Sequence, residues 1–160
     1  MLHTLKRALE AEGDGRFGPF GGADAENTSG GGTQTDLLLI LGAPPDGSLG
    51  RITVLSGREA ARRPLPGAEG LITYGLSQKD TLTVSSAVDR DLALALQREI
   101  VDLRGRRVDR QELLLRRPPY LGLEQTMACV GGLLALGIPP EDIPAILPAQ
   151  RPSRLKMFAP

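Results

Sequence analysis

The glycine-rich run at residues 29–33, Ser-Gly-Gly-Gly-Thr, is the first pattern in this chain that could do chemistry. Backbone amides in such a loop can cradle phosphates, but a nucleotide-binding P-loop also needs a Gly-Lys-Ser/Thr step. The lysine of that step contacts the phosphates, and the hydroxyl binds magnesium. The sequence contains no Gly-Lys pair at any position. We therefore interpret residues 29–33 as part of a solvated linker.

Two pairs of carboxylates could act as general acid and base. Asp89 and Asp91 flank Arg90, and Glu141 adjoins Asp142. The first pair lies where a strand is predicted to begin and the second where a helix is predicted to begin, and acids are ordinary at a helix start. We interpret both pairs as structural, and we assign no catalytic residue.

The chain has one cysteine, Cys129, and one histidine, His3. A disulfide within the chain is therefore excluded, and so is a zinc site built from Cys and His ligands of one chain. A Cys–His nucleophile pair would need Cys129 beside His3, close to the amino terminus. Cys129 lies on the apolar side of a predicted helix, where a small buried hydrophobic role is favoured. We predict no metal and no cofactor.

The composition indicates a soluble globular chain of one domain. Hydrophobic residues make up 41% of its 160 residues and charged residues 24%, and 19 basic residues balance 19 acidic ones. That balance disfavours a nucleic-acid partner. The arginine-rich residues 104–117 are interrupted by Asp109 and Glu112, which favours a solvated hairpin face over an acidic partner. No apolar run reaches the roughly 18 residues of a membrane span, so we expect no membrane insertion and a cytoplasmic location.

Hydrophobic periodicity predicts the elements that position these residues. We expect a helix at residues 1–12, a flexible glycine-rich linker at 13–33 and an α/β domain at 34–155. Strands are predicted at four places, with a helical turn at residues 56–63. The predicted strands are residues 37–41, which we expect to be covered on both faces, 51–55, 70–75 and 81–88.

The second half of the domain has the clearest pattern. Residues 91–116 predict a β-hairpin whose first strand runs to about Leu103, with a turn at Arg104-Gly105 and a bulge at Ile100-Val101. Helices are predicted near 123–137 and 140–148. The fold class is thus α/β, with a sheet of about five to six strands that is packed by these helices and the N-terminal helix.

Three segments taken in order resemble the second half of the central domain of the Mur ligase and folylpolyglutamate synthase family. GLITYGLSQKDTLTVSSAV, residues 70–88, is similar to a family strand that ends in Thr-Phe/Tyr-Gly before an Ala-Asp-like pair, here Lys79-Asp80. PYLGLEQTMACVGGLLALGIPPEDIPAIL, residues 119–147, resembles the family helix that ends in Leu-Gly-Ile. LILGAPPD, residues 39–46, falls where the family has a strand followed by Asn-x-Asp-Asp. The resemblance covers about residues 36–155.

The departures from that family concern its functional residues. The family's P-loop lies upstream of this region and has no counterpart here, and its Asn-x-Asp-Asp falls on Gly42, Pro44 and Pro45. Its Asn-x-x-Asn, which helps to hold the nucleotide, falls on Gly122 and Gln125. At the junction to the family's next domain the glycine is replaced by Ser153, whereas Arg154 is retained. The candidates for contact with a ligand or partner are Tyr120, Gln125 and Arg154.

The resemblance therefore implies a fold that is kept without its catalytic groups. We expect a non-catalytic Mur-ligase-like module, a cytoplasmic interaction or regulatory protein connected with bacterial cell-wall synthesis. One alternative is a fragment or accessory subunit of an ATP-dependent amide ligase that completes its site with another chain. Another alternative is a small-ligand-binding protein. Loss of the first half-domain would leave a strand edge open, so we also expect a homodimer, and a protein partner remains an option.

Overall fold

The structure is a computed structural model that describes residues 35–41, 50–62 and 69–147. The predicted helix at 1–12, the predicted linker at 13–33 and Arg154 lie outside the described residues. The boundary predicted at residue 155 lies outside them as well.

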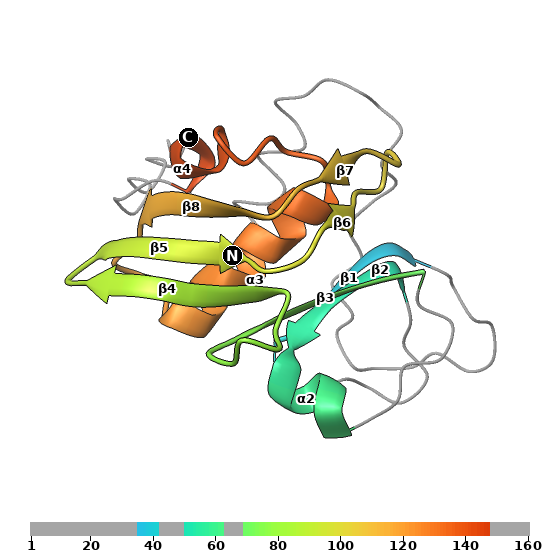
Figure 1. The fold of residues 1–160 in the computed structure, drawn as a ribbon, viewed down its shortest axis with the longest axis horizontal. Coiled ribbons are helices and arrows are strands. Elements are labelled where there is room, and N and C mark those ends of the chain that lie inside the picture. The colour runs from blue at the N-terminus through green and yellow to red at the C-terminus, as the bar shows by residue number, and fades with distance from the viewer. Residues whose placement is uncertain (1–34, 42–49, 63–68, 148–160) are drawn as a thin grey trace, which may run out of the picture.

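The core of the fold is a six-stranded mixed sheet with the order β1-β2-β3-β4-β5-β8 (Figure 1). The first four strands run parallel, whereas β5 is antiparallel to both β4 and β8. Its strands are β1 (Thr35–Leu39), β2 (Gly50–Ser56), β3 (Gly70–Gly75), β4 (Leu82–Val88), β5 (Asp91–Leu96) and β8 (Gln111–Arg116). A separate two-stranded antiparallel ribbon is formed by β6 (Ile100–Val101) and β7 (Arg107–Val108).

One long helix, α3 (Leu123–Ala135), covers one face of the sheet and contacts β1 to β4 (Figure 1). Two short helices accompany it: α2 (Gly57–Arg62) follows β2, and α4 (Ile143–Ile146) packs against β8. Among the described residues, no helix has the length and apolar character needed to cross a membrane.

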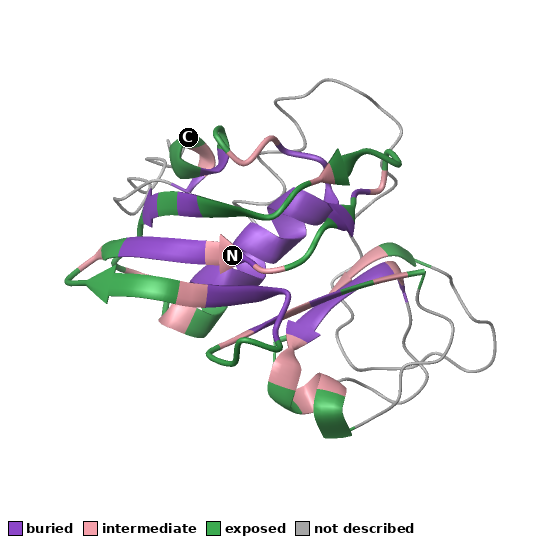
Figure 2. Cartoon of the chain, in the orientation of Figure 1, coloured by how far each residue is buried: buried purple, intermediate pink, exposed green. Residues whose placement is uncertain are grey.

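The hydrophobic core lies between α3 and the sheet. Leu92, Leu94 and Leu96 alternate along β5 and are all buried, as the period of two predicts. Every residue of α3 from Thr126 to Ala135 is buried, and Figure 2 shows this as a continuous buried helix behind strands with exposed stretches. A helix that is buried on nearly all sides has to be small and apolar, as this sequence is.

The fold class is confirmed as α/β, and the predicted strands and the long helix form close to their predicted positions. The long helix packs closely on the sheet at Gly131. A Cβ atom added to Gly131 would lie 2.9 Å from Cγ1 of Val54 in β2 and 3.5 Å from Cγ2 of Ile72 in β3. The neighbours are therefore side chains of the sheet and not another backbone.

The predicted hairpin at residues 91–116 forms as the β5–β8 pair, but the segment that joins the two strands differs from the prediction. β5 ends at Leu96, short of the predicted Leu103, and the chain then builds the β6–β7 ribbon around a turn at Gly105 with φ +78°. The predicted bulge at Ile100-Val101 is wrong, because these residues form β6. The register shift lies instead in β4, between Val84 and Ser86.

Two other predictions need correction. The strand at 37–41 is predicted to be covered on both faces, but among the described residues β1 is an edge strand of the sheet, and Leu37 to Leu39 are only half-buried. The helix expected at 140–148 is limited to α4, which has Pro144 in its first turn. Proline has no backbone N–H, so it is accommodated at a helix start and not in the interior.

The long helix ends as expected at Gly137, which has φ +82°. The N–H of Gly137 donates to Leu134 O, and the N–H of Ile138 donates to Leu133 O. These two hydrogen bonds define a Schellman cap, in which glycine is favoured because of its positive φ.

Candidate functional site

The carboxyl ends of parallel strands are where open α/β sheets usually bind ligands. In this chain both the carboxyl end of β2 and that of β3 carry a glycine. Gly57 directly follows β2, and Gly75 is the last residue of β3. The carboxylate of Asp80 lies against both, since a Cβ added to either glycine would overlap an Asp80 oxygen. Asp80 is 6% exposed, so its side chain is buried against the two strand ends.

Local hydrogen bonds hold Asp80 in that position. The N–H of Ser77 donates to Asp80 Oδ2 at 3.1 Å, and the N–H of Asp80 donates to Ser77 O at 3.0 Å. On the other side, Thr81 N donates to Thr73 Oγ1 at 2.9 Å and Thr73 N donates to Thr81 Oγ1 at 3.3 Å. This reciprocal pair ties the start of the β4 segment to β3, so the turn that carries Asp80 is fixed at both ends.

Tyr74, next to Gly75 in β3, has a structural role. Its side chain is 2% exposed, and its hydroxyl donates to Ile40 O at 3.0 Å, which links β3 to the end of β1. Burial, with smaller contributions from Glu124 and Cys129, raises the pKa of Tyr74 to about 12. The hydroxyl therefore stays protonated near neutral pH and acts as a donor. The predicted counterparts of the family's Asn-x-Asp-Asp, residues 42–45, lie outside the described residues.

Gln125 and Tyr120 are the predicted ligand or partner residues near the start of α3, and they differ in their hydrogen bonding. Gln125 Oε1 accepts a hydrogen bond from Gly122 N at 2.8 Å, and Thr126 Oγ1 donates to Gly122 O at 2.9 Å. Gln125 therefore caps the helix, as a glutamine at the third helical position often does. Tyr120 is half-buried, and its hydroxyl has no hydrogen-bond partner among the described residues.

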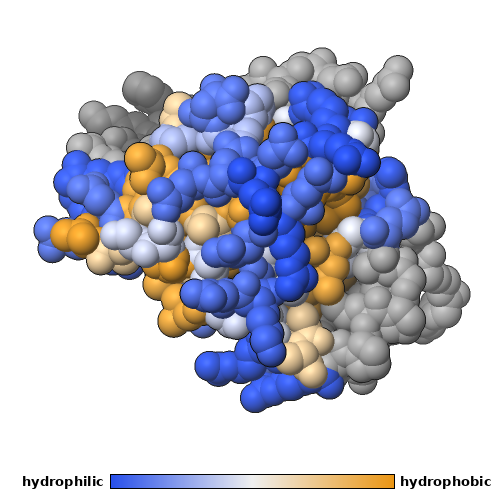
Figure 3. Space-filling view, viewed as in Figure 1, coloured by the Kyte–Doolittle hydropathy of each residue, from blue (hydrophilic) through white to orange (hydrophobic). Residues whose placement is uncertain are grey.

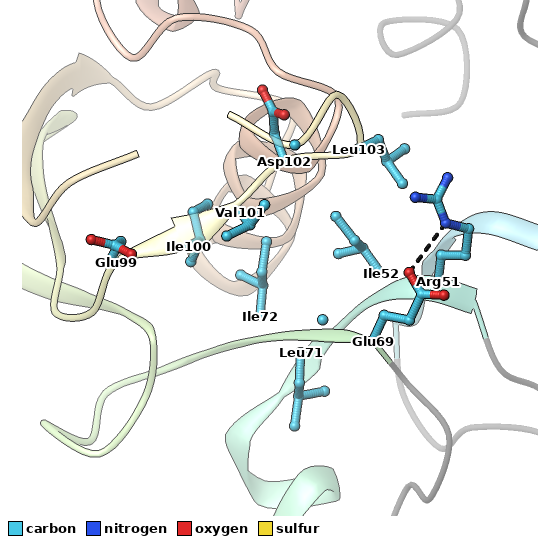
Figure 4. A pocket seen from close by; sticks show the side chains of 12 residues that line it. Arg51, Ile52, Glu69, Leu71, Ile72, Glu99, Ile100, Val101, Asp102 and Leu103 are labelled. Atoms are coloured by element: carbon cyan, nitrogen blue, oxygen red, sulfur yellow. Dashed lines mark hydrogen bonds and ion pairs between the residues drawn. The ribbon is translucent and has the colours of Figure 1, made fainter. Parts of the chain in front are cut away.

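A cleft that the sequence did not indicate lies at the opposite end of the strands. It encloses about 490 Å³ between the amino ends of β2 and β3 and the segment that carries β6. Ile52, Ile72 and Ile100 line its interior, and in Figure 4 Ile72 points toward β6 whereas Leu71 points away. Its volume falls within the range of about 300–1,000 Å³ that is usual for ligand sites.

The charged groups at the mouth of the cleft form ion pairs with one another. Arg51 Nη1 lies 3.2 Å from Asp36 Oδ1, and Arg51 Nε lies 3.3 Å from Glu69 Oε2, the contact dashed in Figure 4. Glu99 Oε1 lies 3.3 Å from Arg107 Nη1. Because Arg51 is shared by two carboxylates, this group keeps a net negative charge at the mouth of the cleft. The charge and the isoleucines of the interior together disfavour a phosphate.

The structure shows where each of the two carboxylate pairs lies. Asp89 occupies the turn between β4 and β5 with φ +53°, and Asp91 Oδ1 lies 3.7 Å from Arg116 Nε. Glu141 and Asp142 are exposed just before α4. Within the described ranges, no three His, Cys, Asp or Glu residues are grouped so that they could hold a metal ion.

Cys129 is a buried thiol, in agreement with its predicted packing role. Its residue is 1% exposed, and burial raises the pKa of the Cys129 thiol to about 11. The thiolate, which is the nucleophilic form, is therefore scarce near neutral pH.

We expect a thiol reagent at pH 8 to modify native Cys129 at least about a hundredfold more slowly than the denatured chain, because the thiolate is both scarce and inaccessible. The rate of labelling by a chromogenic disulfide checks this result. As a matched control, Val88→Cys places a thiol at a position that is 65% exposed and should react at the ordinary rate. Equal rates for the native and denatured wild-type chain would contradict the buried, inert role.

No protein-family model matches the chain, and a search of curated proteins finds no match. The resemblance to the Mur ligases and folylpolyglutamate synthases therefore stays a prediction from the sequence.

Proposed function

We propose that this chain is a non-catalytic interaction module built on a Mur-ligase-like α/β fold. The observation that carries the proposal is the position of Asp80, whose buried carboxylate lies against the glycines at the carboxyl ends of β2 and β3. In open α/β sheets, ligands bind outside the carboxyl ends of the strands. Here a side chain of the protein itself occupies that place at β2 and β3.

The electrostatics support the same proposal. A nucleotide brings phosphate charges to the strand ends, and a buried carboxylate at that place would repel them. The described turn that holds Asp80 is stabilised by backbone and threonine hydrogen bonds rather than by a ligand. Together with the missing Gly-Lys-Ser/Thr step, this arrangement favours a role in binding another macromolecule over turnover of ATP.

The biological setting is proposed from the sequence resemblance alone. Mur ligases act in cell-wall synthesis, so we propose a cytoplasmic regulatory or interaction role connected with that process. The partner is proposed to be a second copy of the chain, in a homodimer, with a further protein as an additional partner.

The 490 Å³ cleft favours a second candidate, a small-ligand-binding protein. Its isoleucine side chains and the net negative charge at its mouth would suit an uncharged or weakly polar ligand rather than an anion. This function would use the amino ends of β2 and β3, so it is compatible with a buried Asp80 at their carboxyl ends.

We expect isothermal titration calorimetry with ATP and magnesium to give no binding heat up to about 1 mM ATP. The physical reason is the absence of the P-loop lysine and hydroxyl together with the carboxylate at the strand ends. Asp80→Asn serves as a matched variant that keeps the shape of the side chain without its charge, and it too should fail to bind. A low-micromolar dissociation constant that depends on magnesium would overturn the proposal and favour the ligase accessory subunit instead.

A further inference from the structure

Strand β8 is one edge of the six-stranded sheet. β5 pairs with it on one side, and within the described residues no strand lies on its other side. On the face of the sheet opposite α3, its middle residue Leu114 is 70% exposed. Figure 3 shows that hydrophobic and hydrophilic surface alternates over this face of β4, β5 and β8. An exposed leucine in an edge strand is a feature that proteins usually avoid unless a partner covers it.

The hydrogen-bond pattern identifies which backbone groups of β8 are open. Arg117 N donates to Arg90 O at 2.7 Å, so these two residues form a hydrogen-bonded pair that continues the β5–β8 register. Such pairs alternate along an antiparallel ladder, so Leu115 and Leu113 also direct their N–H and C=O groups toward β5. The backbone groups of the residues between them therefore point to the open side. These residues are Glu112, Leu114 and Arg116.

These open residues are self-complementary in charge, and their contacts within the chain are exposed: Glu112 Oε1 accepts from Ser85 Oγ, and Arg116 Nε lies 3.7 Å from Asp91 Oδ1. If a second β8 approaches antiparallel and the two-fold axis passes at Leu114, Leu114 lies opposite its own copy. Glu112 then lies opposite Arg116 of the other chain, and Arg116 opposite Glu112. Each opposed pair can exchange two backbone hydrogen bonds, and opposite charges across a strand pair are stabilising.

Other registers lose this match. A shift by one residue breaks the pattern of open backbone groups, because it opposes an open residue with one whose groups face β5. A shift that keeps the open residues opposed places Leu114 against Glu112 or Arg116 and leaves a charge without its complement. One register thus satisfies both the backbone and the charges.

Helix α4 packs against β8 and must be accommodated by the same contact (Figure 1). Its exposed residues are Pro144 and Ala145, both of which are small. The exposed side chains of α4 itself are therefore short, and the longer exposed side chains next to it are Glu141 and Asp142.

We propose that β8 binds β8 of a second copy of this chain in this register, with Leu114 on the two-fold axis and Glu112 opposite Arg116. This inference rests on the proposed function of an interaction module and names its partner and its contact. It closes an otherwise open sheet edge in a symmetric pair, which prevents the continuous stacking that an open edge permits.

Cysteine cross-linking tests the register directly. Directly opposed hydrogen-bonded residues have Cα atoms about 5.5 Å apart, which lies within the range that a disulfide spans. Leu114→Cys should therefore give mostly disulfide-linked dimer under mild oxidation. Glu112→Cys and Arg116→Cys should each remain uncross-linked when alone and should form a heterodimer when mixed. Native Cys129 is buried and does not compete.

Analytical ultracentrifugation supplies a second measurement and the control. The wild-type chain should be a dimer, and Leu114→Lys should raise its dissociation constant roughly tenfold or more, because two like charges then meet at the axis. Val88→Lys changes a similarly exposed residue away from the β8 edge and should leave the dimer intact. Efficient cross-linking of Glu112→Cys alone, or a wild-type monomer at about 100 µM, would overturn the pairing. Neither result would bear on the ATP titration, so failure of this contact and failure of the non-catalytic role remain distinguishable.

Discussion

Replacing Asp102 with alanine is expected to lower the free energy of unfolding by about 3 kcal/mol. The Asp102 side chain is 1% exposed, and its Oδ1 accepts hydrogen bonds from the backbone N–H groups of Arg104 and Arg106, both at 2.8 Å. Its Oδ2 accepts from Arg106 Nε at 2.9 Å, and the same guanidinium donates to Gly137 O at the end of α3. Alanine would remove the acceptor for all these donors and release Arg106 from the helix end.

Urea unfolding followed by circular dichroism measures this loss, and two variants define its origin. Asp102→Asn keeps an oxygen for the two backbone N–H groups but loses the charge that pairs with Arg106, so it should cost about half as much. Asp91→Ala removes an exposed carboxylate whose ion pair with Arg116 spans 3.7 Å, and it should change stability by less than about 0.5 kcal/mol. Equal effects of Asp102→Ala and Asp91→Ala would show that Asp102 does not hold the ribbon to the helix.

Gly131→Leu is expected to destabilise the fold by about 2 kcal/mol, even though leucine favours helix by about 1 kcal/mol relative to glycine. A Cβ atom alone would already lie 2.9 Å from Cγ1 of Val54. The remaining leucine atoms would have to enter a core in which Val54 is 0% exposed and Ile72 is 2% exposed. The overpacking therefore outweighs the gain in helix propensity.

The same unfolding measurement separates packing from propensity. Gly131→Ala adds only the Cβ atom, so its strain and its propensity gain should nearly cancel, with a net change below about 1 kcal/mol. Ala61→Leu introduces a leucine at an exposed position of α2 and should change stability by no more than about 0.5 kcal/mol. A stabilised Gly131→Leu variant would mean that α3 does not pack closely on β2 and β3.

The hairpin at residues 91–116 shows where sequence reasoning succeeded and where it stopped. The alternation of Leu92, Leu94 and Leu96 correctly indicated a strand with one buried face. The break in alternation at Ile100-Val101 predicts a bulge, because the sequence alone offers no reason to start a second ribbon. That reason is tertiary: Leu103 N donates to Ala135 O at the end of α3, and the Arg106 guanidinium donates to Gly137 O just beyond it.

The candidate site was less predictable than the fold. Gln125 was selected as a ligand or partner residue and is a helix cap, although its place three residues after Gly122 could have indicated a capping role. Asp80 was noted only as part of a family-like pair, and its burial against two glycines could not be inferred from its neighbours in sequence. The cleft at the amino ends of β2 and β3 gave no sequence signal, because its walls are ordinary strand residues.

The sequence by itself determined the elements of this protein: the short apolar strands, the long small-residue helix and its glycine end. It also determined which chemistry is missing, since the Gly-Lys-Ser/Thr step is absent from the chain. Only the tertiary structure decided which strands are edges, which carboxylates are buried and which backbone groups of β8 remain open. The reason is range: periodicity, capping and turn chemistry depend on neighbours within a few residues. The decisive contacts join distant segments, as Arg106 and Gly137 do across 31 positions, and no local pattern contains that information.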